Sequence, residues 1–199
     1  SLPESELGDV IRGYLWVIQN RPASLLVNSQ FDTDPKAGKG MEAQQPHPGS
    51  WGVPPGWQRW ATGTFGRIFM VPGRGERRGV RIQGEQGRYA RAGLFQKVLV
   101  KRPGRYLGIV WVKRVGENPA SHVSLQLLSP RIHEETRELE RRSSRGFCLA
   151  APTTEWQPLM VYVDAPFEPV RLYFLLKVEG GDAIFSDAAL YSIPAGKTR

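Results

Sequence analysis

Residues 93–115 read GLFQKVLVKRPGRYLGIVWVKRV, and this stretch decides the fold. Residues 93–100 are mostly apolar and include β-branched and aromatic side chains, which is typical of a short buried strand. Pro103 and Gly104 then mark a turn, and residues 105–115 are again rich in β-branched and aromatic side chains. The stretch therefore predicts two consecutive strands that run back along each other as a hairpin.

Strand signals of the same kind recur on both sides of this hairpin, separated by turn residues. They cover residues 66–71, 78–83, 123–128, 146–150, 156–163, 170–178 and 183–193. Many short strands with turn chemistry between them predict an all-β fold, a β-sandwich. The charged segment 131–145 is predicted to be a helical turn or an exposed loop. Residues 34–60 predict a long loop, and their three tryptophans favour an ordered, functional loop over a disordered one.

The first 23 residues have a different pattern. Apolar side chains recur at helical spacing and form one stripe, which comprises Leu7, Val10, Ile11, Tyr14, Leu15 and Ile18. Arg21-Pro22 ends the helix, because the residue before a proline disfavours helical geometry. So short a helix is marginal alone, so its stripe docks either on its own domain or on a partner chain. The predicted organisation is a helical anchor segment 1–23, a sandwich domain 24–194 and a tail 195–199.

Composition limits the classes of function. The chain has 199 residues, 40% of them hydrophobic, which is enough for one core. Cys148 is the only cysteine, so no intrachain disulfide can form. The chain contains no apolar run long enough for a transmembrane helix, and its start does not read as a signal peptide.

Positive charge is the other compositional feature. Lys and Arg number 27 against 19 acids, a net charge of +8. This suits either a polyanionic partner or a plain basic surface. Ten of these basic residues lie in one stretch of the sequence. They are Arg74, Arg77, Arg78, Arg81, Arg88, Arg91, Lys97, Lys101, Arg102 and Arg105. An arginine-rich face there could hold phosphates, sulfated or carboxylated sugars, or an acidic protein.

Catalytic and nucleic-acid motifs are missing from the sequence. It has no Gly-x-Ser-x-Gly, no His-Glu-x-x-His and no paired cysteine site, and its three histidines lack ligand spacing. No nucleic-acid-binding motif accompanies the arginines. We therefore expect a protein that is not an enzyme and does not bind DNA or RNA.

Five stretches, in chain order, resemble carbohydrate-binding modules of families 4 and 9. They are LLVNSQFD at 25–32, PPGWQRW at 54–60, LFQKVLVKRPGRYLGIVWVKR at 94–114, TTEWQPLMVYVDAP at 153–166 and DAIFSDAALYSI at 182–193. The resemblance implies a jelly-roll β-sandwich of the galactose-binding-domain-like type over residues 25–193. Similar domains occur in phage virion and tail proteins, so the location it implies is a virion or a cell surface.

The resemblance also implies a calcium site. In the family, the acidic residue after the phenylalanine of the first motif meets an aspartate of the last strand, and these positions are Asp32 and Asp187 here. Calcium prefers carboxylate and carbonyl oxygens, which such a site supplies. The alternative is that both carboxylates accept hydrogen bonds from loop amides.

The family binds sugar chains across one sheet or at the loop tips, with aromatic rings stacked on pyranose faces. By this resemblance Gln96 and Trp111 are the first candidates, because both lie in the predicted hairpin. The flanking candidates are Tyr89, Arg91, Lys113 and Trp51. Trp57, Trp156 and Tyr106 are instead predicted to be core residues.

Two functions fit these expectations. The first is a non-catalytic structural or display protein of a virion or surface assembly, which binds glycan and docks on neighbouring subunits or on copies of itself through its helix. The second is a dedicated carbohydrate-binding module of a polysaccharide-active system.

Overall fold

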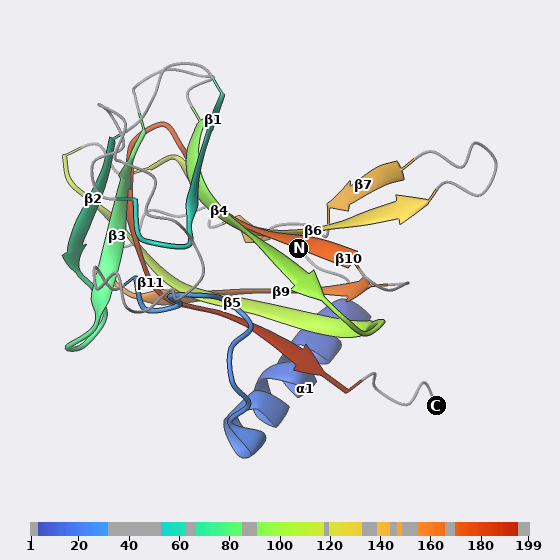
Figure 1. The fold of residues 1–199 in the computed structure, drawn as a ribbon. Helices are drawn as coiled ribbons and strands as arrows, with labels where there is room; N and C mark the ends of the chain where they lie inside the picture. The colour runs from blue at the N-terminus through green and yellow to red at the C-terminus, as the bar shows by residue number, and fades with distance from the viewer. Residues whose placement is uncertain are drawn as a thin grey trace.

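Two antiparallel sheets stack face to face, and one helix covers the outside of the second sheet (Figure 1). The computed structural model describes residues 4–31, 53–62, 67–84, 91–117, 120–132, 139–143, 147–148, 155–165 and 170–194. A β-sandwich with an N-terminal helix is the predicted fold class, and it is confirmed.

Sheet A has six strands in the order β1-β4-β10-β6-β7, with β8 also paired to β6. Its strands are β1 (Gln58–Thr62), β4 (Arg91–Val100), β6 (His122–Ile132), β7 (Leu139–Ser143), β8 (Phe147–Cys148) and β10 (Val170–Glu179). Sheet B has five strands in the order β2-β3-β11-β5-β9. They are β2 (Arg67–Pro72), β3 (Arg78–Gln83), β5 (Gly104–Val115), β9 (Gln157–Ala165) and β11 (Asp182–Ile193).

The predicted hairpin at 93–115 is wrong. β4 pairs with β1 and β10 in sheet A, whereas β5 pairs with β11 and β9 in sheet B. The turn at Pro103-Gly104 therefore carries the chain from one sheet to the other. The apolar pattern reveals only that each strand is buried, and both strands bury side chains in the same core, with Leu94 on β4 and Val110 on β5.

Two loop predictions also need correction. The charged segment predicted as a turn or loop at 131–145 contains the end of β6 and all of β7, which pair from Leu128↔Ser143 to Ile132↔Leu139. Charged residues suit β7 because it is an edge strand, where charge discourages pairing with other chains. The predicted loop 34–60 likewise ends early, since β1 begins at Gln58.

The core fills the space between the sheets. Its largest fully buried side chains include Phe174 of β10, Phe185 of β11 and Phe31, which follows the helix in sequence. Trp57 is 5% exposed, and its ring lies 5.1 Å from Phe31 and 5.9 Å from Phe174. The core prediction for Trp57 is confirmed, and so is that for Tyr106, which is 3% exposed.

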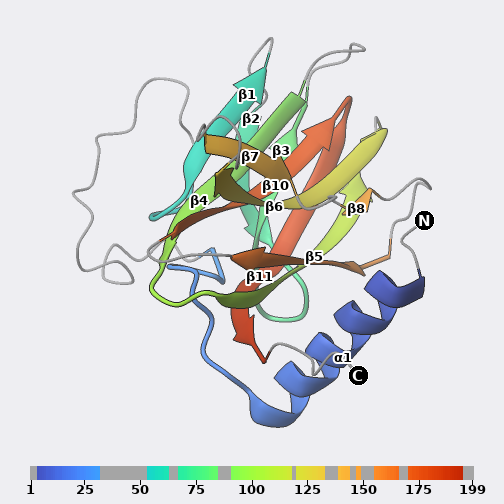
Figure 2. The same cartoon turned by 90° about the vertical axis from the view of Figure 1, so that its right-hand side faces the viewer.

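Helix α1 (Glu4–Asn20) lies across the outer face of sheet B, as the two views agree (Figures 1 and 2). Val10 and Val17 pack against Leu107, Ile109 and Ile193. The helix ends as predicted at Arg21, whose φ of 46° and N–H to Val17 O bond of 2.8 Å form a left-handed C-terminal cap.

The docked face differs from the predicted stripe. Gly13 faces the sheet, and a Cβ there would lie 2.8 Å from Ile193 Cδ1, so a glycine allows the close approach. Of the predicted stripe, Val10 is buried and Tyr14 is half-buried against the same cluster. The other four members, Leu7, Ile11, Leu15 and Ile18, are 46–51% exposed. The helix therefore carries two apolar stripes, one docked on sheet B and one open. Within the described residues, no helix is long and apolar enough to cross a membrane.

Candidate functional site

The outer face of sheet A carries three aromatic side chains, Trp60, Phe95 and Tyr173, here called the aromatic strip. The strand registers place them there. Leu94 points into the core, so Phe95 points outward, and Trp60 is paired with outward-facing Gly93. Tyr173 precedes core residue Phe174. All three rings are partly exposed, and they come from three adjacent strands, β1, β4 and β10.

Two lysines accompany the aromatic strip. The rings of Phe95 and Tyr173 are 6.3 Å apart between centroids and tilted by 30°. Lys97 Nζ lies 5.8 Å from the Phe95 centroid and 5.7 Å from the Tyr173 centroid. Lys177 Nζ lies 6.0 Å from the Trp60 ring. These distances are within the range of cation–π attraction, which holds each ammonium beside a ring.

Gly93 allows this close packing. A Cβ at this position would lie 2.3 Å from Leu176 O on β10 and 3.3 Å from Trp60 Cε3. Glycine therefore lets the indole of Trp60 lie against the strand. The surface formed by the strip is partly apolar and carries lysine ammoniums near its rings.

One carboxylate lies at the end of this surface. Glu179 Oε1 is 2.5 Å from Lys177 Nζ and 3.1 Å from Arg91 Nε. The hydrogen bond from Lys177 lowers the pKa of Glu179, and the charge of Arg91 adds to this effect. Arg91, a predicted ligand residue, is thus on this face and paired with Glu179.

Gln96 points the other way, into the sandwich, and is 5% exposed. Its Oε1 accepts a hydrogen bond from Val27 N at 2.7 Å, and its Nε2 donates to Val27 O at 2.8 Å. These two hydrogen bonds hold the backbone at Val27 against β4, much as a neighbouring strand is held. These contacts favour a structural role for Gln96 over sugar binding.

Side-chain hydrogen bonds to the backbone also hold the segments around Asn28 and Trp57 together. Asn28 Nδ2 donates to Pro55 O at 3.1 Å, and Trp57 Nε1 donates to Asn28 O at 3.1 Å. The first two motifs of the family resemblance, at 25–32 and 54–60, therefore meet at one structural junction. This explains why they indicate a fold and not a ligand.

Trp111 and Lys113 lie on the outer face of sheet B, on β5. The Arg74 guanidinium stacks on the Trp111 ring at 3.8 Å from its centroid, and Lys113 Nζ lies 5.1 Å from the Trp156 ring. Gln96 and Trp111 therefore cannot line one groove, because they belong to different sheets. Trp156 is partly exposed, so its assignment to the core is wrong.

Asp187 sits at an irregularity of β11, where the register with β5 shifts between Ser186 and Ala189. Its φ is 54°. Arg77 Nη1 lies 2.6 Å from its carboxylate and Arg74 Nη1 lies 3.7 Å away. Two guanidiniums at one carboxylate repel a cation, so this half of the predicted calcium site does not fit the metal.

Three predicted site residues, Asp32, Tyr89 and Trp51, lie outside the described residues. Among the described residues there is no group of three or more His, Cys, Asp or Glu that could hold a metal ion. Calcium stays an untested prediction.

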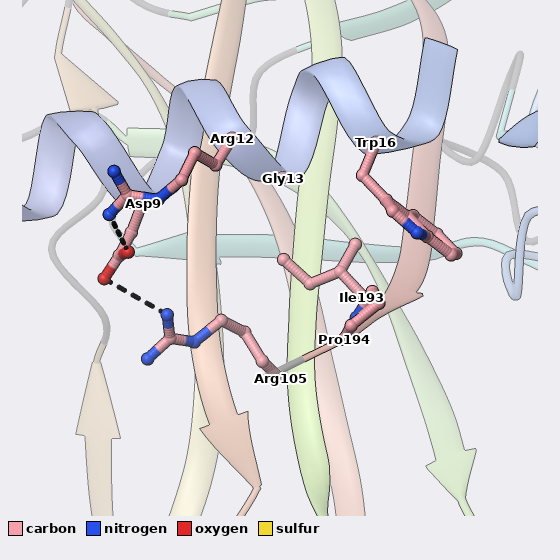
Figure 3. A pocket seen from close by; sticks show the side chains of 7 residues that line it. All are labelled: Asp9, Arg12, Gly13, Trp16, Arg105, Ile193 and Pro194. Carbon is pink, nitrogen blue, oxygen red and sulfur yellow. Dashed lines mark hydrogen bonds and ion pairs between the residues drawn. The ribbon is translucent and has the colours of Figure 1, made fainter. Parts of the chain in front are cut away.

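A shallow cavity of about 160 Å³ lies along the seam between α1 and sheet B (Figure 3). Asp9 accepts ion pairs there from Arg12 at 2.6 Å and Arg105 at 3.1 Å, and Arg105 also reaches Asp164 at 2.9 Å. The hydrogen bond from Arg12 lowers the pKa of Asp9, and Arg105 acts in the same direction. The cavity is thus part of the contact that fastens the helix.

The arginine-rich stretch does not form a single face. Arg91 lies on sheet A and pairs with Glu179, whereas Arg81 and Arg105 lie on sheet B. Arg81 pairs with Asp182, and Arg77 pairs with Asp187. Each of these acids comes from a segment far away in the sequence. The number of arginines in the stretch is therefore a poor guide to how much positive charge is left unpaired on its surface.

No family model matches the chain, and no curated protein sequence matches it. Solved structures do resemble it. A proposed sugar-binding protein from Bacteroides thetaiotaomicron has a TM-score of 0.52 at 12% identity, over 85% of this chain and all of that one. The CBM22-1 and GH10 modules of a Clostridium thermocellum endo-1,4-β-D-xylanase, complexed with xylohexaose, give 0.51 at 18% identity over 69% of this chain. The enzymatically active domain of bacteriophage CBA120 tailspike protein 4 gives 0.50 at 17% identity over 70% of this chain.

The match covers only 26% of the xylanase structure and 20% of the tailspike structure. At these identities the likeness concerns the fold alone. The chain has the β-sandwich fold that occurs in carbohydrate-binding modules and in a phage tailspike domain.

Proposed function

We propose that this protein is a non-catalytic glycan-binding module whose binding surface is the outer face of sheet A. The observation that carries the proposal is the aromatic strip, three partly exposed rings on three adjacent strands with lysines beside them. Aromatic faces stack on the apolar faces of pyranose rings, and ammonium groups donate hydrogen bonds to sugar oxygens. The neighbours described as sugar-binding or complexed with xylohexaose support the same class of ligand.

Sheet A is also the sheet that α1 leaves uncovered. The helix lies on sheet B (Figure 1). On the outer face of that sheet, Trp111 already has the Arg74 guanidinium stacked on its ring. A sugar on sheet B would have to displace that guanidinium. On sheet A the lysine ammoniums lie farther from the rings, 5.7–6.0 Å from the centroids, so a sugar there has less to displace.

The test is affinity electrophoresis of the purified chain through gels that each contain one soluble polysaccharide. We expect retardation by at least one polysaccharide, and we expect Tyr173→Ala to weaken binding about tenfold, since one lost stacking contact is worth about 1.4 kcal/mol on the affinity scale. Trp111→Ala is the matched control on the other sheet and should be retarded like the parent. No retardation of the folded parent, or equal retardation of Tyr173→Ala, would refute the proposal.

A second candidate function is that of a display or structural subunit on a virion or cell surface. The open stripe of α1, formed by Leu7, Ile11, Leu15 and Ile18, is the observation that favours it. Four aliphatic side chains at spacings of four, four and three residues make a helix-packing seam. A phage tailspike domain with the same fold is in keeping with this role.

A second copy of this chain is the occupant that fits the open stripe. In an antiparallel pair of α1 helices, Leu7 would lie opposite Ile18 and Ile11 opposite Leu15, so the stripe complements itself. The acidic first turn of one helix would lie beside Arg21 of the other, and opposite charges attract there.

Light scattering coupled to size exclusion tests this second role. We expect a dimer for the parent, a monomer for Leu15→Glu and a dimer for Gln19→Glu, which changes an exposed polar residue of the same helix. A monomeric parent at its highest soluble concentration would rule out self-association through α1.

A further inference from the structure

On the outer face of sheet A, basic side chains lie next to the aromatic side chains along the paired strands. Lys97 is paired with Tyr173 across β4 and β10, and Lys177 is paired with Gly93 beside Trp60. Arg171 and Arg91 lie at the two ends of the same pair of strands, both exposed. Each aromatic ring of the strip therefore has a lysine ammonium 5.7–6.0 Å from its centroid.

Negative charge is scarce on this face. Among the outward-facing residues of β4 and β10, which the structure describes from end to end of their pairing, four are cations and one is a carboxylate, Glu179. Lys177 and Arg91 both contact Glu179, so that carboxylate is already neutralised. Lys97 makes no ion pair with any residue that the structure describes, and its ammonium contacts only the two rings.

Lys97 is positioned where a charged sugar substituent would lie. A pyranose stacked on the Tyr173 or Phe95 ring carries its equatorial substituents outward in the plane of the sugar. The ammonium of Lys97 lies over both rings, 5.8 Å from the Phe95 centroid and 5.7 Å from the Tyr173 centroid, so a sugar stacked on either ring comes directly next to it. A carboxylate or sulfate at that edge would gain a charge-assisted hydrogen bond, which a hydroxyl would not.

We propose that the outer face of sheet A selects an anionic glycan, with Lys97 as the residue that recognises the carboxylate or sulfate. This inference rests on the proposed function, because it assigns a ligand class to the same surface. It goes beyond stacking, since the rings alone do not distinguish charged from neutral sugars.

The experiment uses polysaccharides in matched pairs that share a backbone and differ in charge. The pairs are polygalacturonate with its methyl ester, alginate with its propylene glycol ester, and chondroitin sulfate with desulfated and esterified chondroitin. Dissociation constants are measured by isothermal titration calorimetry on the full chain. For the pair that is bound, we expect the anionic member to bind at least about tenfold more tightly, and the preference to shrink as salt rises.

Two variants distinguish recognition at Lys97 from a general attraction of the polymer to the protein's net charge of +8. Lys97→Gln should abolish the preference for the anionic member, because it weakens binding of that member much more than binding of the neutral member. Lys101→Gln removes the same charge at the exposed β4–β5 turn, outside the strip, and should keep the preference. Equal losses in both variants would mean that net charge attracts the polymer, and would overturn the inference.

The two proposals fail in different ways. Equal or tighter binding of the neutral member overturns the anionic preference and leaves glycan binding intact, provided that Tyr173→Ala still weakens it. An absence of binding to every polysaccharide overturns the proposed function, and the anionic preference with it.

Discussion

Gln96 shows how a single side chain can be placed on the correct strand and still be assigned the wrong role. Its position on β4 was predictable, but its direction was not, because a glutamine between Leu94 and Val98 breaks the apolar alternation that defines the inward face. Its amide is satisfied by both backbone atoms of Val27, a residue 69 positions away. Such a partner cannot be found from local pattern.

We expect Gln96→Ala to lower the free energy of unfolding by about 1–3 kcal/mol, because a buried side chain and its two hydrogen bonds to the backbone of Val27 are lost. Urea denaturation followed by tryptophan fluorescence measures the change. Gln19→Ala on exposed helix surface is the control and should change stability little. A stable Gln96→Ala variant with weakened glycan binding would restore this residue to the binding site.

Asp9 allows a prediction of pH dependence. Its folded-state pKa is lowered below the ordinary value of 3.8, chiefly by the hydrogen bond from Arg12. A lowered pKa means that the ion pairs of Asp9 stabilise the fold above about pH 3.8, and that this stability is lost as the pH falls through the folded-state pKa.

The comparison of the parent with Asp9→Asn at two pH values checks this sign. At pH 7 we expect the variant to be less stable by about 0.3–1 kcal/mol, since Asp9 is partly exposed and solvent screens the pairs. At pH 2.5 the difference should shrink, because the parent carboxylate is then increasingly protonated. An equal difference at both pH values would show that the ion pairs of Asp9 do not set it.

At the scale of elements, α1 was predicted with the correct end but with the wrong face. Spacing alone placed its apolar residues in one stripe. In the structure Gly13 lies so close to sheet B that a Cβ there would be 2.8 Å from Ile193 Cδ1. The helix needs this glycine for packing, although glycine weakens an isolated helix.

Gly13→Leu should therefore loosen the helix, at a cost of about 1–3 kcal/mol for overpacking against Ile193 and Leu107. Gly8→Ala is the matched glycine substitution away from the sheet, where the nearest group is the flexible Arg12 side chain. It should stabilise the protein by up to about 1 kcal/mol through helix propensity. Hydrogen exchange of the α1 backbone amides reports undocking. If both variants have the same effect, close packing at Gly13 is not what holds the helix.

For the strands, too, one part of the structure was predictable from the sequence and another part was not. Most were predictable, because alternation and turn residues are local features. The partner of each strand was not, since β4 and β5 were expected to pair and instead lie in opposite sheets. The choice between a hairpin and a crossover depends on where the other strands bury their apolar faces.

At the scale of the whole molecule, the sequence predicted the sandwich better than it predicted the site. Phe95 and Tyr173 are 78 positions apart and become neighbours only through the pairing of β4 with β10. Trp60 joins them from β1, inside what the sequence predicted as a loop. The candidate residues Gln96 and Trp111 were chosen from the false hairpin, and each now has a structural partner, Val27 or Arg74.

The most direct test is an NMR titration of the protein with an oligosaccharide of the polysaccharide that it binds. The indole N–H signal of each tryptophan is followed separately. We expect the Trp60 signal to shift until the protein is saturated, and the signals of Trp57 in the core and Trp111 on sheet B to stay in place. A titration that shifts Trp111 and leaves Trp60 unchanged would place the sugar on sheet B and contradict the central claim.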